Sequence, residues 1–447
     1  MKTTMKKPAL MLVILMLVVT ALSACGSNNA KGSNEPAGNK NETSGATDPA
    51  KVETVKLNFY AQYSGAEKTV YDAARDKMKE IMPEVEIEFE VAAQDDEQKI
   101  KTYAAAGSLP DIFFASSGLI ETLKKSDHLM MMDDVVKENN IEALLNDSSK
   151  PMLWNKDGHS YSVPNVGQWA GIIYYNKELF SQHNVKVPTN YTEYLEAVKA
   201  FAKTDIVPLA LFAKEKWPGV LLLDMAIVGS EPAGLKKLDQ GEGNFSEAAY
   251  EQGVRKLSEL AAAGLLSKNA FNTTADDAKA QFTSGKAAMY LNGAWAMGDI
   301  ESEMGDKLGI LFAPFADADK VEQVKWNVSG GGFNQGFAVS KNSKNKELAA
   351  KYAALFSIEF AKQRIIQIGD PNSILVEDVQ PTNGFTSVQK QYASDSMNFK
   401  TMTAFAWGYE NPKFKTSIED NAQKLLAGQS VEDFIKETDK ALEQARK

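Results

Sequence analysis

The stretch from Phe282 to Trp295 constrains the fold more than any other part of this sequence. Phe282 closes an apolar run with helical spacing, and Ser284-Gly285 supplies a helix stop. Residues 287–291 are short and apolar, as in a buried strand, and Asn292-Gly293 predicts a break where the backbone turns sharply. Trp295 is therefore expected just beyond the carboxyl end of a strand, where ligands bind in open α/β sheets. The alternative is an ordinary strand–turn–helix unit with a tryptophan in the core.

Helical and strand patterns alternate along the chain from residue 55 onward. Pro83 ends a helical stripe, and residues 85–91 alternate apolar side chains with glutamates, as in a half-exposed strand. The first expected elements are a strand at 55–60, a helix at 66–82, a strand at 85–91, a helix at 94–106 and a buried strand at 109–114, and a long helix is expected at 346–368. Such alternation predicts an α/β protein with a largely parallel sheet.

The pattern from Phe282 to Trp295, F-x-x-G-K-A-A-M-x-x-x-G-x-W, resembles the signature of family 1 extracellular solute-binding proteins. These are the sugar-binding components of ABC importers and are related to maltodextrin-binding protein. Residues 107–112, 172–180 and the glycines at 330–332 also resemble that family. The resemblance implies a two-lobe, periplasmic-binding-protein-like fold of class II with a hinged cleft. It places lobe one at residues 52–168 with 328–378, and lobe two at residues 169–327 with 379–447.

The resemblance and the expected cleft single out aromatic residues as ligand contacts. Trp295 is the first candidate, and Trp169 is the second because it precedes the predicted crossover; Gln168 beside it favours a neutral ligand. Trp407 lies in a region from which relatives often bring an aromatic ring to the sugar, and Trp217 follows a predicted strand. Core packing is the alternative for Trp169 and Trp407, and Trp217 can equally begin a helix that packs inward.

Small residues and a glycine-rich segment supply the remaining candidates. Ser116 and Ser117 either donate hydrogen bonds to a ligand or cap the helix expected near Ile120. Gly331, Gly332 and Phe333 lie in a predicted return crossing, where glycine permits close approach of the backbone or a hinge.

Composition excludes several classes of protein. The net charge of −10 and the pI of about 5.2 argue against nucleic acid or an anionic membrane surface as partner. Cys25 is the only cysteine, so an intrachain disulfide is excluded, and HExxH, Walker A and GxSxG patterns do not occur. The resemblance implies a carbohydrate-binding protein, with an oligosaccharide as the favoured ligand, and we expect neither enzymatic activity, a cofactor nor a metal. Two alternatives stay open: an extracellular glycoside-active enzyme using two carboxylates, and a surface-binding lipoprotein that transports no solute.

The amino-terminal residues have the features of a bacterial lipoprotein. Three lysines precede an apolar run of signal-peptide length at 9–21, and Leu22 to Cys25 resembles a lipobox. The resemblance implies removal of residues 1–24 and attachment of a lipid to the sulfur of Cys25. Residues 25–51 have no large apolar side chain, which predicts a flexible tether. We expect a monomer, anchored at the outer face of the cytoplasmic membrane, that delivers its ligand to ABC permease subunits; the alternative is a plain signal peptide with an incidental cysteine.

Overall fold

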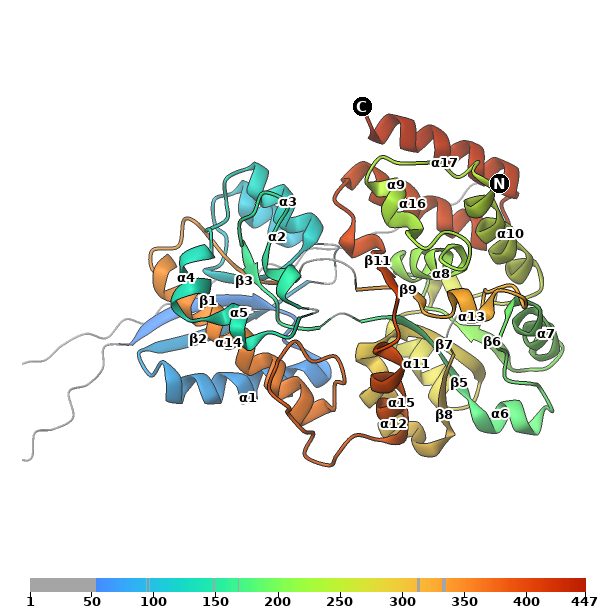
Figure 1. Ribbon diagram of the computed structural model, residues 1–447, viewed down its shortest axis with the longest axis horizontal. Helices are drawn as coiled ribbons and strands as arrows, with labels where there is room; N and C mark the ends of the chain where they lie inside the picture. Colours follow the sequence, from blue (N-terminus) through green and yellow to red (C-terminus); the bar gives the residue numbers. More distant parts are fainter. Residues whose placement is uncertain are drawn as a thin grey trace, which may run out of the picture. The chain divides into compact units, whose positions relative to one another are not determined.

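Two separate β-sheets, each with its own helices, organise the chain (Figure 1). The computed structural model describes residues 54–447, apart from residues 94, 96, 148, 168, 312, 313 and 332–334. The chain divides into Met1–Lys51 and Val52–Lys447, and the second unit holds both sheets. The predicted α/β fold with two lobes is thereby confirmed. The predicted signal peptide, the lipidation site Cys25 and the tether lie outside the described residues.

Lobe one is built on a five-stranded sheet in the order β2-β1-β3-β10-β4. β1 pairs in parallel with β2 and β3, whereas β10 is antiparallel to β3 and β4. The elements of this lobe are β1 (Val55–Ala61), α1 (Gly65–Ile81), β2 (Val85–Val91), α2 (Gln98–Ala105), β3 (Ile112–Ser116), α3 (Ser117–Lys125), α4 (Asp133–Glu138), α5 (Ile141–Leu144), η1 (Lys150–Leu153), β4 (Ser162–Val163), β10 (Gln335–Val339) and α14 (Lys346–Ile368).

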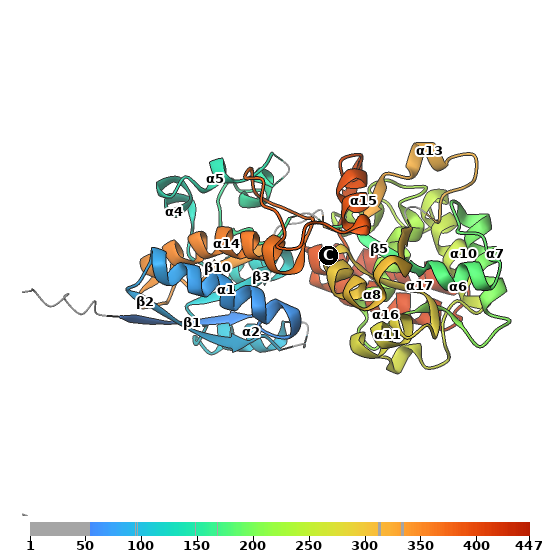
Figure 2. The same cartoon turned by 90° about the horizontal axis from the view of Figure 1, so that it is seen from below.

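The alternation of side chains along β1 decides which helices cover each face of this sheet. Phe59 belongs to a core shared with α1 and α14, and its neighbour Tyr60 belongs to a second core shared with α2 and α3. Figure 2 shows α1 and α14 side by side, in agreement with their extensive contact. At the sheet edge, the apolar residues Val85 and Ile87 of β2 are buried and the glutamates that follow each of them, Glu86 and Glu88, are exposed, as their alternation predicts.

Lobe two is built on a four-stranded sheet in the order β6-β7-β5-β8. β6 is parallel to β7, and β5 is antiparallel to both β7 and β8. The elements of this lobe are β5 (Gly171–Asn176), α6 (Lys177–Gln182), α7 (Tyr191–Phe201), β6 (Val207–Ala210), α8 (Trp217–Ile227), α9 (Gly234–Asp239), α10 (Ala248–Ala262), η2 (Ala270–Asn272), α11 (Ala275–Thr283), β7 (Ala287–Gly293), η3 (Ala294–Ala296), α12 (Met297–Met304), η4 (Gly305–Lys307), β8 (Leu308–Leu311), α13 (Val321–Val324), α15 (Ser387–Ser396), η5 (Ala406–Gly408), α16 (Pro412–Leu426) and α17 (Val431–Ala445).

The predicted break of the strand at Asn292-Gly293 is wrong, because β7 continues through both residues. Gly293 has φ −85° and ψ 167°, an extended conformation that any residue can adopt. A glycine is needed here for a different reason: a Cβ atom at this position would lie 1.8 Å from Cζ3 of Trp295. Trp295 still follows the strand directly, as expected, and its ring lies over the glycine.

A short ribbon of two paired strands lies where the chain crosses between the lobes. β9 (Asn327–Ser329) pairs in parallel with β11 (Thr401–Thr403), and Gly330 forms a bridge with Ala170 just before β5. Gly330 has φ 142°, and a Cβ atom on it would lie 2.3 Å from the carbonyl oxygen of Trp169. The return crossing is therefore packed closely against the first crossing. Among the helices of the described residues, none combines the length and the apolar character that a membrane span requires.

Candidate functional site

One edge of the sheet in lobe two brings together three tryptophans that are distant in sequence. Because β5 and β7 are antiparallel, the start of β5 lies beside the end of β7, and Gly171 pairs with Gly293. Trp169, just before β5, and Trp295, just after β7, are therefore neighbours. β6 is parallel to β7, so the chain leaving β6 reaches the same edge and begins α8 with Trp217.

The ribbon adds a fourth tryptophan to this edge. Trp407 lies in η5, shortly after β11, and its ring is 4.8 Å from that of Trp217 and 6.0 Å from that of Trp295, between centroids. Trp169 and Trp295 meet edge to face, with centroids 4.3 Å apart and an interplanar angle of 89°. Phe405, which is fully buried, packs against Trp169 with ring centroids 5.0 Å apart and so supports these tryptophans from the core. We call Trp169, Trp217, Trp295 and Trp407 the tryptophan wall.

The tryptophan wall lines a cavity of about 640 Å³, within the size range of ligand sites. Trp169 and Trp217 are at most 9% exposed, whereas Trp295 and Trp407 are half-buried and offer more of their surface to the cavity. Nε1 of Trp217 donates to Oε2 of Glu215 at 2.8 Å, which fixes the orientation of this indole. Trp217 therefore both begins a helix and lines the cavity, so the two alternatives given for it are compatible.

Lobe one contributes a group of charged and polar side chains to the cavity, beside aromatic residues that include Tyr60, Phe114 and Phe360. At the centre of this polar group is Arg364 of α14, which is 5% exposed. It forms ion pairs with Glu67 and, at 2.7 Å, with Asp370. Burial lowers the pKa of the Arg364 guanidinium, but the charges of Glu67 and Asp370 outweigh that effect and raise it overall. Oδ1 of Asp370 also accepts hydrogen bonds from the backbone and side-chain nitrogens of Asn372. We call Glu67, Arg364, Asp370 and Asn372 the polar cluster; all four residues line the cavity.

The sequence patterns did not predict the polar cluster, although one feature of the sequence pointed to it. Arg364 lies among isoleucines and a phenylalanine in the helix predicted at 346–368, and a charge on an apolar helix surface needs a buried partner. The partners themselves were not predictable, because Glu67 is far from Arg364 in sequence and only α1 packing on α14 brings them together.

The remaining predicted site residues are placed differently. Ser116 lines the cavity and also caps α3, because its Oγ accepts a hydrogen bond from the backbone nitrogen of Leu119 at 3.3 Å. Ser117 begins α3 and does not line the cavity. Gly331 does not line it either; its backbone nitrogen donates to the carbonyl oxygen of Trp169 at 2.6 Å. Gln168, Gly332 and Phe333 lie outside the described residues.

The family follows from a comparison with known proteins. Residues 73–369 match the model of the bacterial extracellular solute-binding protein family, which is more than half of the chain. The chain belongs to this family. The solute-binding protein is 25% identical over 262 residues to the multiple sugar-binding protein of Streptococcus mutans, an alignment that covers 57% of this chain and 60% of that relative.

Solved structures agree with this assignment. A structure from work on xylan utilization by the thermophilic bacterium Caldanaerobius polysaccharolyticus has a TM-score of 0.76 and 25% identity, over 86% of this chain and 99% of the other. A chitin oligosaccharide binding protein has a TM-score of 0.75 and 21% identity, over 88% and 99% of the two chains. The solute-binding protein thus shares its fold with these proteins along nearly their whole length.

A buried carboxyl group holds the ribbon against lobe two. Asp224 of α8 is fully buried and accepts hydrogen bonds from the backbone nitrogen of Leu235 at 2.7 Å, from Oγ of Ser329 in β9 at 2.5 Å, and from the hydroxyl of Thr403 in β11. Burial raises the pKa of Asp224 to about 6, although the hydrogen bonds from its partners lower it. Because α8 begins at Trp217 and Trp407 follows β11, Asp224 fixes two parts of the tryptophan wall relative to each other.

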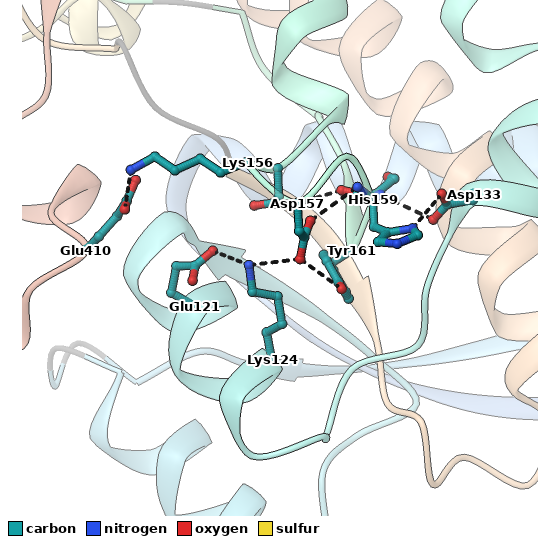
Figure 3. A network of polar contacts seen from close by, with 10 residues as sticks. Glu121, Lys124, Asp133, Lys156, Asp157, His159, Tyr161 and Glu410 are labelled. Atoms are coloured by element: carbon teal, nitrogen blue, oxygen red, sulfur yellow. Dashed lines mark hydrogen bonds and ion pairs between the residues drawn. The ribbon is translucent and has the colours of Figure 1, made fainter.

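A polar network on the surface joins the lobes at a second place (Figure 3). Nζ of Lys156, on a turn of lobe one, lies 2.7 Å from Oε2 of Glu410 in lobe two. The neighbouring Asp157 holds the turn in place, since its carboxylate contacts Lys124 and Tyr161, each at 3.2 Å. On the other side, the buried carboxylate of Asp239 accepts hydrogen bonds from the backbone nitrogens of Glu410 and Asn411. Both partners of the ion pair are therefore held from their own lobes.

In the part of the chain that the structure describes, no three His, Cys, Asp or Glu side chains are grouped so that they could hold a metal ion. The cavity combines the flat rings of the tryptophan wall with the fixed charged and polar groups of the polar cluster, a mixture that is typical of ligand sites.

Proposed function

We propose that this protein is the substrate-binding lipoprotein of an ABC importer, and that it captures a carbohydrate, an oligosaccharide, between its lobes. The observation that carries the proposal is the tryptophan wall in one cavity with the polar cluster. The relatives support a carbohydrate, because they include a multiple sugar-binding protein, a chitin oligosaccharide binding protein and a structure from work on xylan utilization.

These two groups of side chains match the two kinds of surface on a sugar ring. The C–H faces of a pyranose are apolar and gain from contact with an aromatic ring, whereas its hydroxyl groups need hydrogen-bond partners when water is removed. Trp295 and Trp407 are the half-buried members of the wall and supply the first kind of contact. The polar cluster supplies the second, and its ion pairs hold the polar atoms in place before a ligand arrives.

Residues 52–168 with 328–378, and residues 169–327 with 379–447, are proposed as the two bodies that close around the ligand. Closure about a few hinge residues is an established type of motion in binding proteins of this kind. The close packing of Gly330 on Trp169 supports a hinge at these crossings, because both segments are then held at one point. The closed form is proposed to be the one that membrane permease subunits recognise.

The amino-terminal part of the proposal rests on the sequence. Residues 1–24 are proposed as a signal peptide, Cys25 as the lipid-bearing residue and residues 25–51 as the tether of a monomer on the outer face of the cytoplasmic membrane. The description of the family as extracellular supports a location outside the cytoplasm.

Binding without catalysis fits the carboxylates in the cavity better than hydrolysis does. A glycoside hydrolase needs one carboxyl group held protonated as an acid and a second that acts as nucleophile or base. Several of the carboxylates that line the cavity are instead held by partners within the protein: Glu67 and Asp370 by Arg364, Glu97 by Lys101, and Glu215 by Nε1 of Trp217. The carboxyls of Asp224 and Asp239, whose pKa values burial raises to about 6, do not line the cavity.

A thermal-shift screen tests the proposal. The purified protein is heated with xylotriose, chitobiose, raffinose and maltotriose, and with amino acids and inorganic phosphate as non-carbohydrate controls. A ligand at about 100 times its dissociation constant stabilises the folded state by about 2.7 kcal/mol, so at least one sugar should raise the melting temperature. Stabilisation by an amino acid or phosphate, with none by any sugar, would overturn the proposal.

A further inference from the structure

Asn165 is a buried polar residue whose hydrogen-bonding capacity is not used. Its side chain is 3% exposed and lines the same cavity as the tryptophan wall. Its Oδ1 atom is buried and has no hydrogen-bond partner among the residues that the structure describes. Buried polar atoms are nearly always paired, and leaving one unpaired is unfavourable.

The backbone of the segment that carries Asn165 is held by hydrogen bonds on both sides of this residue. The hydroxyl of Ser357 in α14 donates to the carbonyl oxygens of Val163 at 3.1 Å and of Pro164 at 2.5 Å. On the other side, the backbone nitrogen of Gly167 donates to the carbonyl oxygen of Asn372 at 3.2 Å. Asn165 is therefore fixed between α14 and the segment that carries the polar cluster.

Its position within the cavity separates Asn165 from other buried polar atoms without a partner. The hydroxyls of Tyr194 and Tyr409 also have no partner among the described residues, but neither tyrosine lines the cavity. Asp95 also lines the cavity and its Oδ1 is buried without a partner, but its other carboxylate oxygen accepts a hydrogen bond from the backbone nitrogen of Lys99 at 2.9 Å, and the residue as a whole is only half-buried. Asn165 thus carries an unpaired acceptor on a residue that lines the cavity, and a turn of its side chain toward the cavity brings Oδ1 to a ligand that supplies the missing donor.

We infer that Asn165 is a specificity-determining ligand contact, whose Oδ1 accepts a hydrogen bond from a hydroxyl group of the bound solute. The inference rests on the proposed function and adds to it a requirement on the ligand. The solute must present a hydroxyl donor to lobe one while its apolar face meets the tryptophan wall. A solute without a hydroxyl at that position leaves Oδ1 unpaired in a closed cavity, and the protein discriminates against it.

The substitution Asn165→Ala tests this assignment with the sugar that gives the largest shift among xylotriose, chitobiose, raffinose and maltotriose. Calorimetric titration should show affinity at least tenfold weaker than wild type, because a buried hydrogen bond to the ligand is lost. The matched control is Asn421→Ala. Asn421 is 5% exposed and has partners in Thr438 and Lys424, away from the cavity. That control should keep the wild-type affinity. Equal affinity of Asn165→Ala and wild type would overturn the inference while leaving the proposed function intact.

A second measurement needs no ligand. If Oδ1 of Asn165 has no partner in the free protein, Asn165→Ala should unfold in urea at the same or a higher midpoint than wild type. Asn421→Ala should unfold at a lower midpoint, because it removes the buried hydrogen bond that Nδ2 of Asn421 donates to Oγ1 of Thr438. If Asn165→Ala lowers the midpoint as much as the control does, Asn165 has a structural partner and the inference fails, whichever sugar binds.

Discussion

The substitution Asp224→Asn gives a quantitative test of how the ribbon is held. An asparagine has nearly the shape of aspartate, and its Oδ1 can still accept from the backbone nitrogen of Leu235. Its Nδ2 can donate to the hydroxyl oxygens of Ser329 and Thr403, which donate to the carboxylate in the wild-type protein. The hydrogen bonds are therefore kept, and only the ionisable proton is removed.

The magnitude follows from the pKa of Asp224, which burial raises from 3.8 to about 6. Because the folded-state pKa is the higher one, the folded protein binds the proton more tightly, and its stability falls as the pH rises from about 4 to about 6. The full loss corresponds to about 3 kcal/mol. Asparagine does not ionise, so the stability of Asp224→Asn relative to wild type should increase by about 2 kcal/mol between about pH 4.5 and about pH 7.5.

Urea denaturation of both proteins at the two pH values measures this difference. The pKa of Asp239 is also raised to about 6, so the wild-type curve alone mixes two carboxyl groups, whereas the difference between the two proteins isolates Asp224. Asp239→Asn serves as the matched control for a buried carboxyl outside the ribbon. If the difference between Asp224→Asn and wild type does not change with pH, the carboxyl of Asp224 is not buried as described, and the account of the ribbon is wrong.

Three further substitutions test the site. Trp295→Ala should weaken sugar binding at least tenfold in calorimetry without unfolding the protein, whereas Trp326→Ala, outside the cavity, should bind as wild type does; equal affinities would remove Trp295 from the site. Arg364→Met should lower the free energy of unfolding by about 3–5 kcal/mol, because the buried carboxylate of Asp370 and the half-buried carboxylate of Glu67 lose their partner; a change below about 1 kcal/mol would contradict the ion pairs described. Lys156→Met should lower the free energy of unfolding by less than about 1 kcal/mol, because the ion pair with Glu410 is exposed. A double-mutant cycle with Glu410→Gln should show a coupling energy of about 0.2–1 kcal/mol, and no coupling would mean that the pair does not form.

Local periodicity predicted most helices and strands because the burial of a face leaves a regular trace in the sequence. The helix predicted at 346–368 is α14 (Lys346–Ile368), and the strand predicted at 85–91 is β2. The prediction was less accurate where no apolar stripe marks an end. The helix predicted at 94–106 is α2, which spans Gln98–Ala105, and the spacing of apolar residues did not indicate this later start.

Of the residues that line the cavity, the tryptophans could be predicted from the sequence, but their arrangement could not. Trp169, Trp217 and Trp295 were chosen because each lies near a predicted crossover or strand end, and Trp407 was chosen from the family resemblance; the structure places all four on one cavity. Their mutual arrangement depends on the antiparallel register of β5 and β7, which no short-range pattern encodes. The ligand-binding roles assigned to these residues stay predictions.

The side of the cavity in lobe one could not be derived in this way. Arg364 and Glu67 meet only through the packing of two long helices. Asn165 stands out because its Oδ1 has no hydrogen-bond partner among the described residues, and no sequence pattern indicates a missing partner. The reason given for Gly293 was likewise wrong, since its role depends on where the ring of Trp295 lies in space.

Tryptophan fluorescence during a sugar titration tests the central claim most directly. Four of the six tryptophans form the tryptophan wall, so a ligand in the cavity must change the surroundings of most emitters. We predict a saturable change in emission with the same midpoint as calorimetric binding of the sugar. Calorimetric binding without any change in tryptophan emission would show that the solute binds elsewhere, and would contradict the account.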